Sequence, residues 1–422
     1  MDSSASALAQ SLRRFCLGAF AFLARELEEG AELPFSFEEH RSPGRPSLYE
    51  YRPLAKAFVE ARAEPLAAIP DTTLALEELR LLPQARIFSR AHTGGSAGAV
   101  GGSTAGDPLF RAVLLPLVVQ TAEAVGGFDW DDEGFDASFQ QLERSLFGSE
   151  RRYSALAPLV GLSAPAPIEL GSAVLVRMAE PGELASLWPE AGGLLPRDFG
   201  REPDRLCVLQ CERPLSAEQV EAPDAPGELT DAVTALRLAT AGPIAAGPVA
   251  FERLDGRPYG IRPVLPIAAT QPAGEATRLD VFRGRLARDL LTCLAAAETD
   301  AELGEALDRW ELSLFQEEPF RSEQLRQALT GLLGGQDGAW AAALRAAVLL
   351  GETGNERGQL LSCLRSLVHG EAATPDAADA VRRSLVETLV YRDRGQLVQA
   401  LDETLLGLRP RPRAAFAARA AV

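Results

Sequence analysis

Lysine is almost absent from this chain. Lys56 is the only lysine, and the other 41 of the 42 basic residues are arginines. A P-loop needs a lysine directly after its glycine-rich segment, so the sequence excludes that class of nucleotide site. The same lack leaves Lys56 as the only lysine that can form a Schiff base with a carbonyl substrate.

Cysteine is also scarce. The five cysteines are odd in number and widely spread, which is typical of free thiols in a reducing cytoplasm. Cys207 and Cys211 lie in an apolar run, 206–211, that has the pattern of a strand. Two soft ligands without a nearby histidine disfavour zinc, so we interpret both as small buried side chains. No metal or other cofactor is predicted.

Long apolar runs are missing as well. The apolar stretch 15–23 is too short to cross a bilayer. A signal peptide is the alternative, because Arg13 and Arg14 precede this stretch, but the charged continuation 24–29 offers no cleavage site. Apolar residues recur there at helical spacing: Leu12, Phe15, Cys16, Phe20 and Leu23. We therefore expect an amphipathic packing helix, no membrane partner and a cytoplasmic protein.

Acidic residues outnumber basic ones and give a net charge of -17. Because phosphate contacts need a basic surface, this balance excludes a general nucleic-acid coat and disfavours DNA as a partner. Apolar residues make up 46% of the chain and charged residues 24%, a globular composition. A length of 422 residues predicts two or three domains.

Composition divides the chain into three regions and a tail. Residues 1–150 are mainly helical in pattern, 151–275 are α+β, 276–408 form a helical bundle, and 409–422 form a flexible basic tail that contains Arg409, Arg411, Arg413 and Arg419. The predicted fold class is mixed: N-terminal helical and α+β regions followed by an all-α C-terminal bundle.

Two segments of the N-terminal region imitate ligand loops. The Gly/Ser segment 93–103 has no lysine and no preceding strand, so we interpret it as a linker and not as a phosphate cradle. The acidic segment 129–136 resembles a calcium loop, but Gln140 stands where the closing glutamate belongs. An acidic first turn of a helix explains it better. His40 and His92 lie in loop-like segments and are interpreted as surface residues.

Short apolar runs broken by proline and glycine predict the middle region's strands. They are 168–170, 173–178, 206–211, 248–253 and 259–262, with one clear helix at 228–240. Beyond residue 276, apolar residues recur at intervals of three and four residues. This spacing predicts helices at 279–297, 301–315, 322–333, 339–350, 356–368, 377–390 and 395–408, with Gly334, Gly335, Gly351 and Gly370 as C-caps.

One pair of side chains hints at chemistry. Arg365 and His369 are four residues apart at the end of the predicted helix 356–368, which brings them onto one face. A fixed cation beside a base that titrates near neutral pH suits phosphodiester chemistry. The structural alternative is a histidine that caps the helix or interacts with its dipole.

The order of several C-terminal pieces resembles an Apea-like HEPN domain. They are Ala306-Leu307-Asp308-Arg309-Trp310, the segment 325–333, the segment 344–350, and Arg365-Ser366-Leu367-Val368-His369-Gly370. The resemblance covers about the last 140 residues, and a weaker likeness extends upstream into 156–184.

The resemblance implies a HEPN-like bundle that dimerises so that two Arg/His motifs share a cleft. Carried over to this sequence, Arg365 and His369 would be the catalytic residues and Ser366 the polar neighbour that helps binding. Three residues separate Arg365 from His369 here, whereas the catalytic members have four to six.

Three hypotheses from different classes remain open. The first is a metal-independent endoribonuclease, a stress or antiphage effector, in which His369 is base or acid and Arg365 anchors the phosphate. The second is a HEPN-like scaffold that binds RNA, a nucleotide or a protein without cleaving it. The third is a purely structural dimerising bundle. In the first two, residues 1–275 act as a sensor or regulator.

Overall fold

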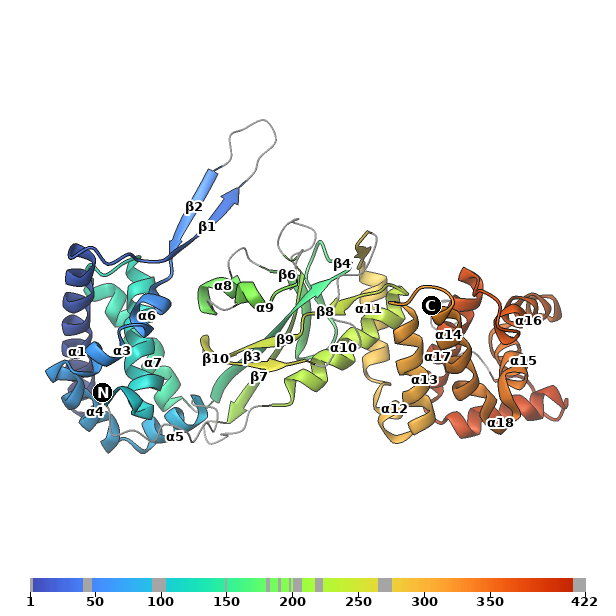
Figure 1. The fold of residues 1–422 in the computed structure, drawn as a ribbon. Coiled ribbons are helices and arrows are strands. Elements are labelled where there is room, and N and C mark those ends of the chain that lie inside the picture. Colours follow the sequence, from blue (N-terminus) through green and yellow to red (C-terminus); the bar gives the residue numbers. More distant parts are fainter. Residues whose placement is uncertain are drawn as a thin grey trace.

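The computed structural model describes residues 3–40, 48–92, 104–148, 150–179, 183–188, 191–196, 199, 207–216, 223–264 and 275–412. Helices form one end of the molecule, an antiparallel sheet occupies the middle, and a second set of helices forms the other end (Figure 1). The predicted mixed fold class with a helical C-terminal part is confirmed. In the described residues, no helix is both long and apolar enough to span a membrane.

The N-terminal helices share one hydrophobic cluster, to which α1, from Ser3 to Glu28, contributes one face. All the apolar positions that predicted an amphipathic helix here are buried, namely Leu12, Phe15, Cys16, Phe20 and Leu23. The prediction is confirmed. The other elements are α2 (Ala55–Glu60), α3 (Ala63–Ala67), α4 (Pro70–Leu81), α5 (Pro83–His92), η1 (Thr104–Gly106), the π-helical turn η2 (Phe110–Leu114), α6 (Leu115–Val125) and α7 (Asp132–Phe147).

The acidic segment before α7 is a helix start, as predicted. The Asp131 side chain accepts a hydrogen bond from the Gly134 backbone N–H at 2.8 Å, and Asp132 and Glu133 occupy the first turn. Carboxylates are stabilised there by the positive end of the helix dipole.

A two-stranded ribbon, β1 (Phe35–His40) and β2 (Leu48–Pro53), projects from the N-terminal helices (Figure 1). The loop assignments of both N-terminal histidines were wrong, because His40 ends β1 and His92 ends α5. The missed signal for the ribbon is the alternation of aromatic with polar residues in both strands, a pattern with period two. The Gly/Ser segment 93–103 lies outside the described residues.

The central sheet has the strand order β10-β9-β3-β7-β6-β5, with the short β8 also paired to β3, and its pairs are antiparallel. Every strand predicted for the middle region is present. The bounds are β3 (Glu150–Val160), β5 (Ile168–Glu169), β6 (Val174–Met178), β7 (Cys207–Ser216), β8 (Ala245–Ala246), β9 (Val249–Leu254) and β10 (Arg257–Pro263); β4 (Leu162–Ser163) pairs in parallel with β11 (Thr277–Arg278).

The sheet buries both faces. One face packs against α10 (Ala225–Thr240), and it includes Cys207 and Cys211, whose predicted burial is confirmed. The other face carries Phe251 and is covered by Trp188, which lies between α8 (Glu183–Leu187) and α9 (Ala191–Leu194).

The C-terminal helices follow the predicted segments with two exceptions. The predicted helix 279–297 is divided into two helices, and Gly334, predicted as a C-cap, lies inside a π-helical turn. The elements are α11 (Val281–Leu291), α12 (Ala295–Thr299), α13 (Ala301–Ser313), α14 (Phe320–Leu329) with the π-helical turn η4 (Thr330–Gly334), η5 (Gly335–Asp337), α15 (Gly338–Leu350), α16 (Gly354–Val368), α17 (Pro375–Tyr391) and α18 (Arg394–Leu405). One hydrophobic cluster continues from Tyr153 in the sheet to Leu401 in α18. The helices therefore share their core with the sheet.

The start of the basic tail is described as far as residue 412. Arg409 lies 3.3 Å from Glu403, and Arg411 lies 3.8 Å from Glu352. Arg413 and Arg419 lie outside the described residues, so the predicted flexibility of this tail stays a prediction.

Candidate functional site at the end of α16

The last two turns of α16 carry the three residues that the sequence singled out. The helix begins with a capping box, in which Thr353 accepts from the Glu356 backbone N–H at 3.2 Å. Leu364 and Leu367 are fully buried and fix the inward face. Arg365 and His369 are consequently exposed, while Ser366 is half-buried.

His369 is the C-cap residue of α16. The Gly370 N–H donates to the Leu367 carbonyl at 3.1 Å, and the Glu371 N–H donates to the Ser366 carbonyl at 3.0 Å. These two bonds form a Schellman motif, which needs a left-handed residue, and Gly370 supplies it with φ of 81°. The predicted C-cap role of Gly370 is therefore confirmed.

Two neighbouring helices hold this end of α16. The Ala373 N–H donates to Ser322 Oγ of α14 at 2.8 Å, and Cys363 Sγ lies 3.4 Å from Thr374 Oγ1, the N-cap of α17. Ser366 donates its own hydroxyl proton to the Cys363 carbonyl at 3.1 Å, which leaves its oxygen as an acceptor. The turn that presents Arg365 and His369 is thus fixed from both sides.

The charge of Arg365 is not neutralised within the described part of the chain. Its guanidinium makes no ion pair and no hydrogen bond there. Arg326 and Arg382 differ, since Arg326 forms two hydrogen bonds to Glu323 and Arg382 contacts Asp379 and the Leu238 carbonyl. Arg321, Arg383 and Arg392 resemble Arg365, because their guanidiniums also have no partner in the described residues. Arg365 is therefore available to an external anion.

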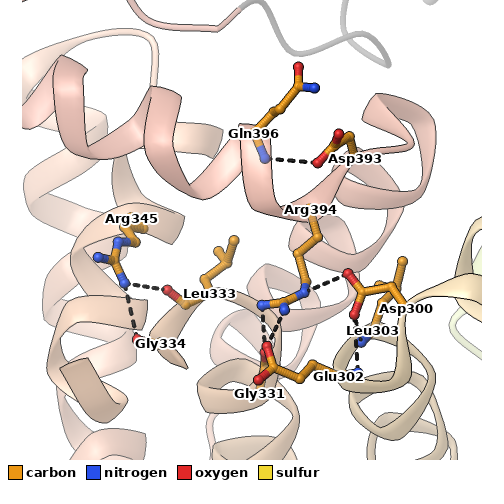
Figure 2. A network of polar contacts seen from close by, with 10 residues as sticks. All are labelled: Asp300, Glu302, Leu303, Gly331, Leu333, Gly334, Arg345, Asp393, Arg394 and Gln396. Carbon is orange, nitrogen blue, oxygen red and sulfur yellow. Dashed lines mark hydrogen bonds and ion pairs between the residues drawn. The ribbon is translucent and has the colours of Figure 1, made fainter. Parts of the chain in front are cut away.

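Figure 2 shows Arg345 and Arg394, two arginines whose guanidiniums form hydrogen bonds within the protein. Arg345 donates to the Leu333 and Gly334 carbonyls at 2.8 and 3.1 Å, and Arg394 donates to the Gly331 carbonyl at 3.4 Å and to Asp300 at 2.9 Å. All three carbonyls belong to η4, so the guanidiniums satisfy backbone acceptors of the π-helical turn. Their role is structural.

A groove of about 360 Å³ lies beside α16, against α17. Its polar lining includes Glu356, Asp376, Asp379 and Arg383, and Cys363 also lines it. Neither Arg365 nor His369 contributes to it. The described part of the chain also contains no group of three or more His, Cys, Asp or Glu side chains that could hold a metal ion.

The comparisons with known proteins give no family. No family model matches the chain, and neither a curated protein nor a solved structure shows significant similarity to it. The resemblance to a HEPN domain consequently rests on the quoted C-terminal residues alone.

A cavity of about 460 Å³ between the N-terminal helices and the sheet was not predicted from the sequence. Lys56, Arg111 and Glu123 line it together with apolar side chains. Its residues come from segments far apart in the sequence, which no linear motif joins. The one available signal was the single lysine.

Proposed function

We propose that the end of α16 binds an RNA phosphate and cleaves the RNA without a metal ion, as a HEPN-type endoribonuclease. The observation that carries the proposal is the exposure of Arg365 and His369 one helical turn apart, with the guanidinium unpaired in the described part of the chain. A solvent-facing cation and an imidazole four residues apart supply the charge and the base that this reaction needs.

The reaction needs a base, an acid and a cation. The imidazole of His369 removes the proton from a ribose 2′-hydroxyl, whose oxygen attacks the adjacent phosphorus. The bond to the 5′-oxygen of the next nucleotide breaks, and that oxygen takes up a proton. The products are a 2′,3′-cyclic phosphate and a 5′-hydroxyl. Arg365 stabilises the negative charge on the phosphate oxygens with its planar fork of donors.

A dimer would complete the site. One imidazole cannot be base and acid in the same step, and a second copy would bring a second Arg365–His369 pair. We therefore propose a homodimer through the C-terminal helices, with RNA bound between the two α16 ends. DNA lacks the 2′-hydroxyl and would not react. Residues 1–275 would sense the stress or antiphage signal and control the dimer.

The second candidate is a HEPN-like scaffold that binds RNA, a nucleotide or a protein without cleaving it. The position of His369 favours this alternative, because His369 is the C-cap residue of α16 and the pair does not line the groove next to α16. In this function Arg365 is an anion contact and His369 only ends the helix.

Cleavage of mixed RNA in EDTA separates the two candidates. The wild-type protein should cleave, while His369→Ala and Arg365→Ala should lose most of that activity. Thr353→Ala is the matched control, because it weakens the opposite end of the same helix, and Arg383→Ala removes an exposed arginine of α17. Both controls should cleave like the wild type. Equal cleavage by all five proteins would contradict the nuclease, and RNA binding without cleavage would support the scaffold.

A further inference from the structure

The cavity between the N-terminal helices and the sheet has the size of a small-molecule site. Its volume is about 460 Å³, within the range of roughly 300–1,000 Å³ that is common for ligand pockets. One wall comes from α2, α3, η2 and α6, and the other from Leu187 at the end of α8 and from the turn between β9 and β10. A molecule in it would touch both parts of the protein.

Lys56 lies in the wall of this cavity. Its ammonium donates to the Leu187 carbonyl at 3.0 Å and lies 3.8 Å from Glu60, and its side chain is 18% exposed. The Leu187 carbonyl takes one of the three N–H donors of the ammonium, and Glu60 lies beyond hydrogen-bond distance, so two donors remain for a ligand. In a chain that otherwise uses arginine for every basic residue, the only lysine occupies this place. A compact point charge suits a crowded wall better than a planar guanidinium.

A second cation reaches the cavity from a π-helical turn. Arg111 belongs to η2, and its Nε donates to the Ala105 carbonyl at 2.8 Å. That bond fixes the direction of the guanidinium, and both Nη groups stay without a hydrogen bond in the described part of the chain. Single π-helical turns often occur at functional sites. The two cations, Lys56 and Arg111, could together bind one carboxylate of a ligand.

Two carboxylates and an apolar surface complete the lining. Glu60 and Glu123 balance the two cations, which disfavours a polyanion such as a nucleoside triphosphate. Leu115, Val119 and Leu187 supply the apolar surface. The cavity therefore offers partners for a positive group, a negative group and a hydrocarbon body.

We propose that this cavity binds a small zwitterion with apolar side chains, of dipeptide size. The ligand carboxylate contacts Lys56 and Arg111, its ammonium contacts Glu60 and Glu123, and its side chains pack on the apolar surface. Bound in this way, the ligand strengthens the junction that the Lys56 hydrogen bond already makes between α2 and α8. This site is independent of Arg365 and His369.

The single lysine gives a direct probe. Incorporation of ¹³C,¹⁵N-labelled lysine places the label at Lys56 alone, because the chain has one lysine, and it leaves all three N–H donors of the ammonium in place. Leucyl-leucine should shift the Lys56 signal saturably. N-acetyl-leucyl-leucine lacks the ammonium and leucyl-leucinamide lacks the carboxylate, so each should bind at least about tenfold more weakly, the usual effect of losing a charge-assisted hydrogen bond. Absence of a saturable shift, or equal binding of the blocked forms, would overturn the proposal.

Variants test the same contacts by calorimetry on unlabelled protein. Arg111→Gln should weaken leucyl-leucine binding at least about tenfold. Arg86→Gln, which removes an exposed arginine of α5 outside the cavity, is the matched control and should bind like the wild type. Equal weakening by both substitutions would contradict the assigned contacts. Because the blocked dipeptides are compared on wild-type protein, the test does not depend on the folding of any variant.

Discussion

Arg237 of α10 and Glu311 of α13 form a buried ion pair, with Nη1 3.0 Å from Oε1 and side-chain exposures of 2% and 3%. Thr234 donates to the same carboxylate oxygen at 2.7 Å, and Arg237 Nε donates to the Ile244 carbonyl at 2.7 Å. Because α10 packs on the sheet and α13 belongs to the C-terminal helices, this pair joins the two parts inside their common core.

Removing one partner of this pair should strongly destabilise the protein. Arg237→Met leaves the Glu311 carboxylate buried without its counter-ion, and breaking a buried pair in this way costs roughly 3–5 kcal/mol. The double variant Arg237→Met/Glu311→Leu should lose less free energy of unfolding than Arg237→Met alone, because it leaves no unpaired buried charge. Urea unfolding followed by circular dichroism measures both. A loss below about 1 kcal/mol for Arg237→Met would show that the pair does not hold the junction.

Asp231 of α10 should make stability depend on pH. Burial first, and then the neighbouring Glu298 and Asp224, raise the pKa of its carboxyl to about 6 from the ordinary 3.8. Because the folded-state pKa is raised, ionisation of Asp231 opposes folding. This cost is absent below pH 3.8, grows as the pH rises and is complete above pH 6.

Asp231→Asn removes that cost. The substitution should stabilise the protein by about 1–2 kcal/mol at pH 7, after allowance for the partial exposure of the side chain. The gain should disappear below about pH 4. Urea midpoints of both proteins between pH 3.5 and 8, a range of roughly two units on either side of the raised pKa, test this. A gain that is the same at every pH would contradict the assignment.

The same substitution at two helical glycines should act in opposite directions. A Cβ at Gly284 of α11 would lie 2.4 Å from Ile168 Cγ2 of β5, so Gly284→Ala should destabilise by about 1–3 kcal/mol. Gly358 in α16 is exposed and a Cβ there meets nothing within 4 Å. Gly358→Ala should therefore stabilise by about 0.5–1 kcal/mol. Thermal unfolding compares the two, and a shift of the same sign for both would refute the packing of α11 on β5.

Helical spacing was sufficient to predict most of the C-terminal helices, although the segment 279–297 forms two helices and not one. Each amphipathic segment there has one buried stripe, and its ends carry local signals such as Thr353 and Gly370. The central strand β3 was missed because Pro158 interrupts its apolar run. Proline is rare inside central strands, yet Pro158 stands opposite Val208, and its carbonyl accepts from the Gly247 N–H at 2.8 Å.

Of the two candidate sites, the one at the end of α16 could be predicted from the sequence and the cavity around Lys56 could not. Arg365 lies in the last turn of α16 and His369 is its C-cap residue. Both are exposed, while Leu364 and Leu367 are buried. The spacing of four residues that predicted a common face is a local pattern, which sequence alone can supply. The cavity around Lys56 is assembled by tertiary packing from four separate stretches between residues 56 and 258. No local pattern encodes such a site.

We propose that Arg365 and His369 cleave RNA through its own 2′-hydroxyl. The most direct measurement compares an oligoribonucleotide of randomised sequence with its fully 2′-O-methylated counterpart, in EDTA, with wild-type protein and with His369→Ala. We expect only the wild-type protein to cleave, only the unmethylated RNA to be cleaved, and the products to carry 2′,3′-cyclic phosphate ends. Cleavage of the methylated strand, or undiminished cleavage by His369→Ala, would contradict it.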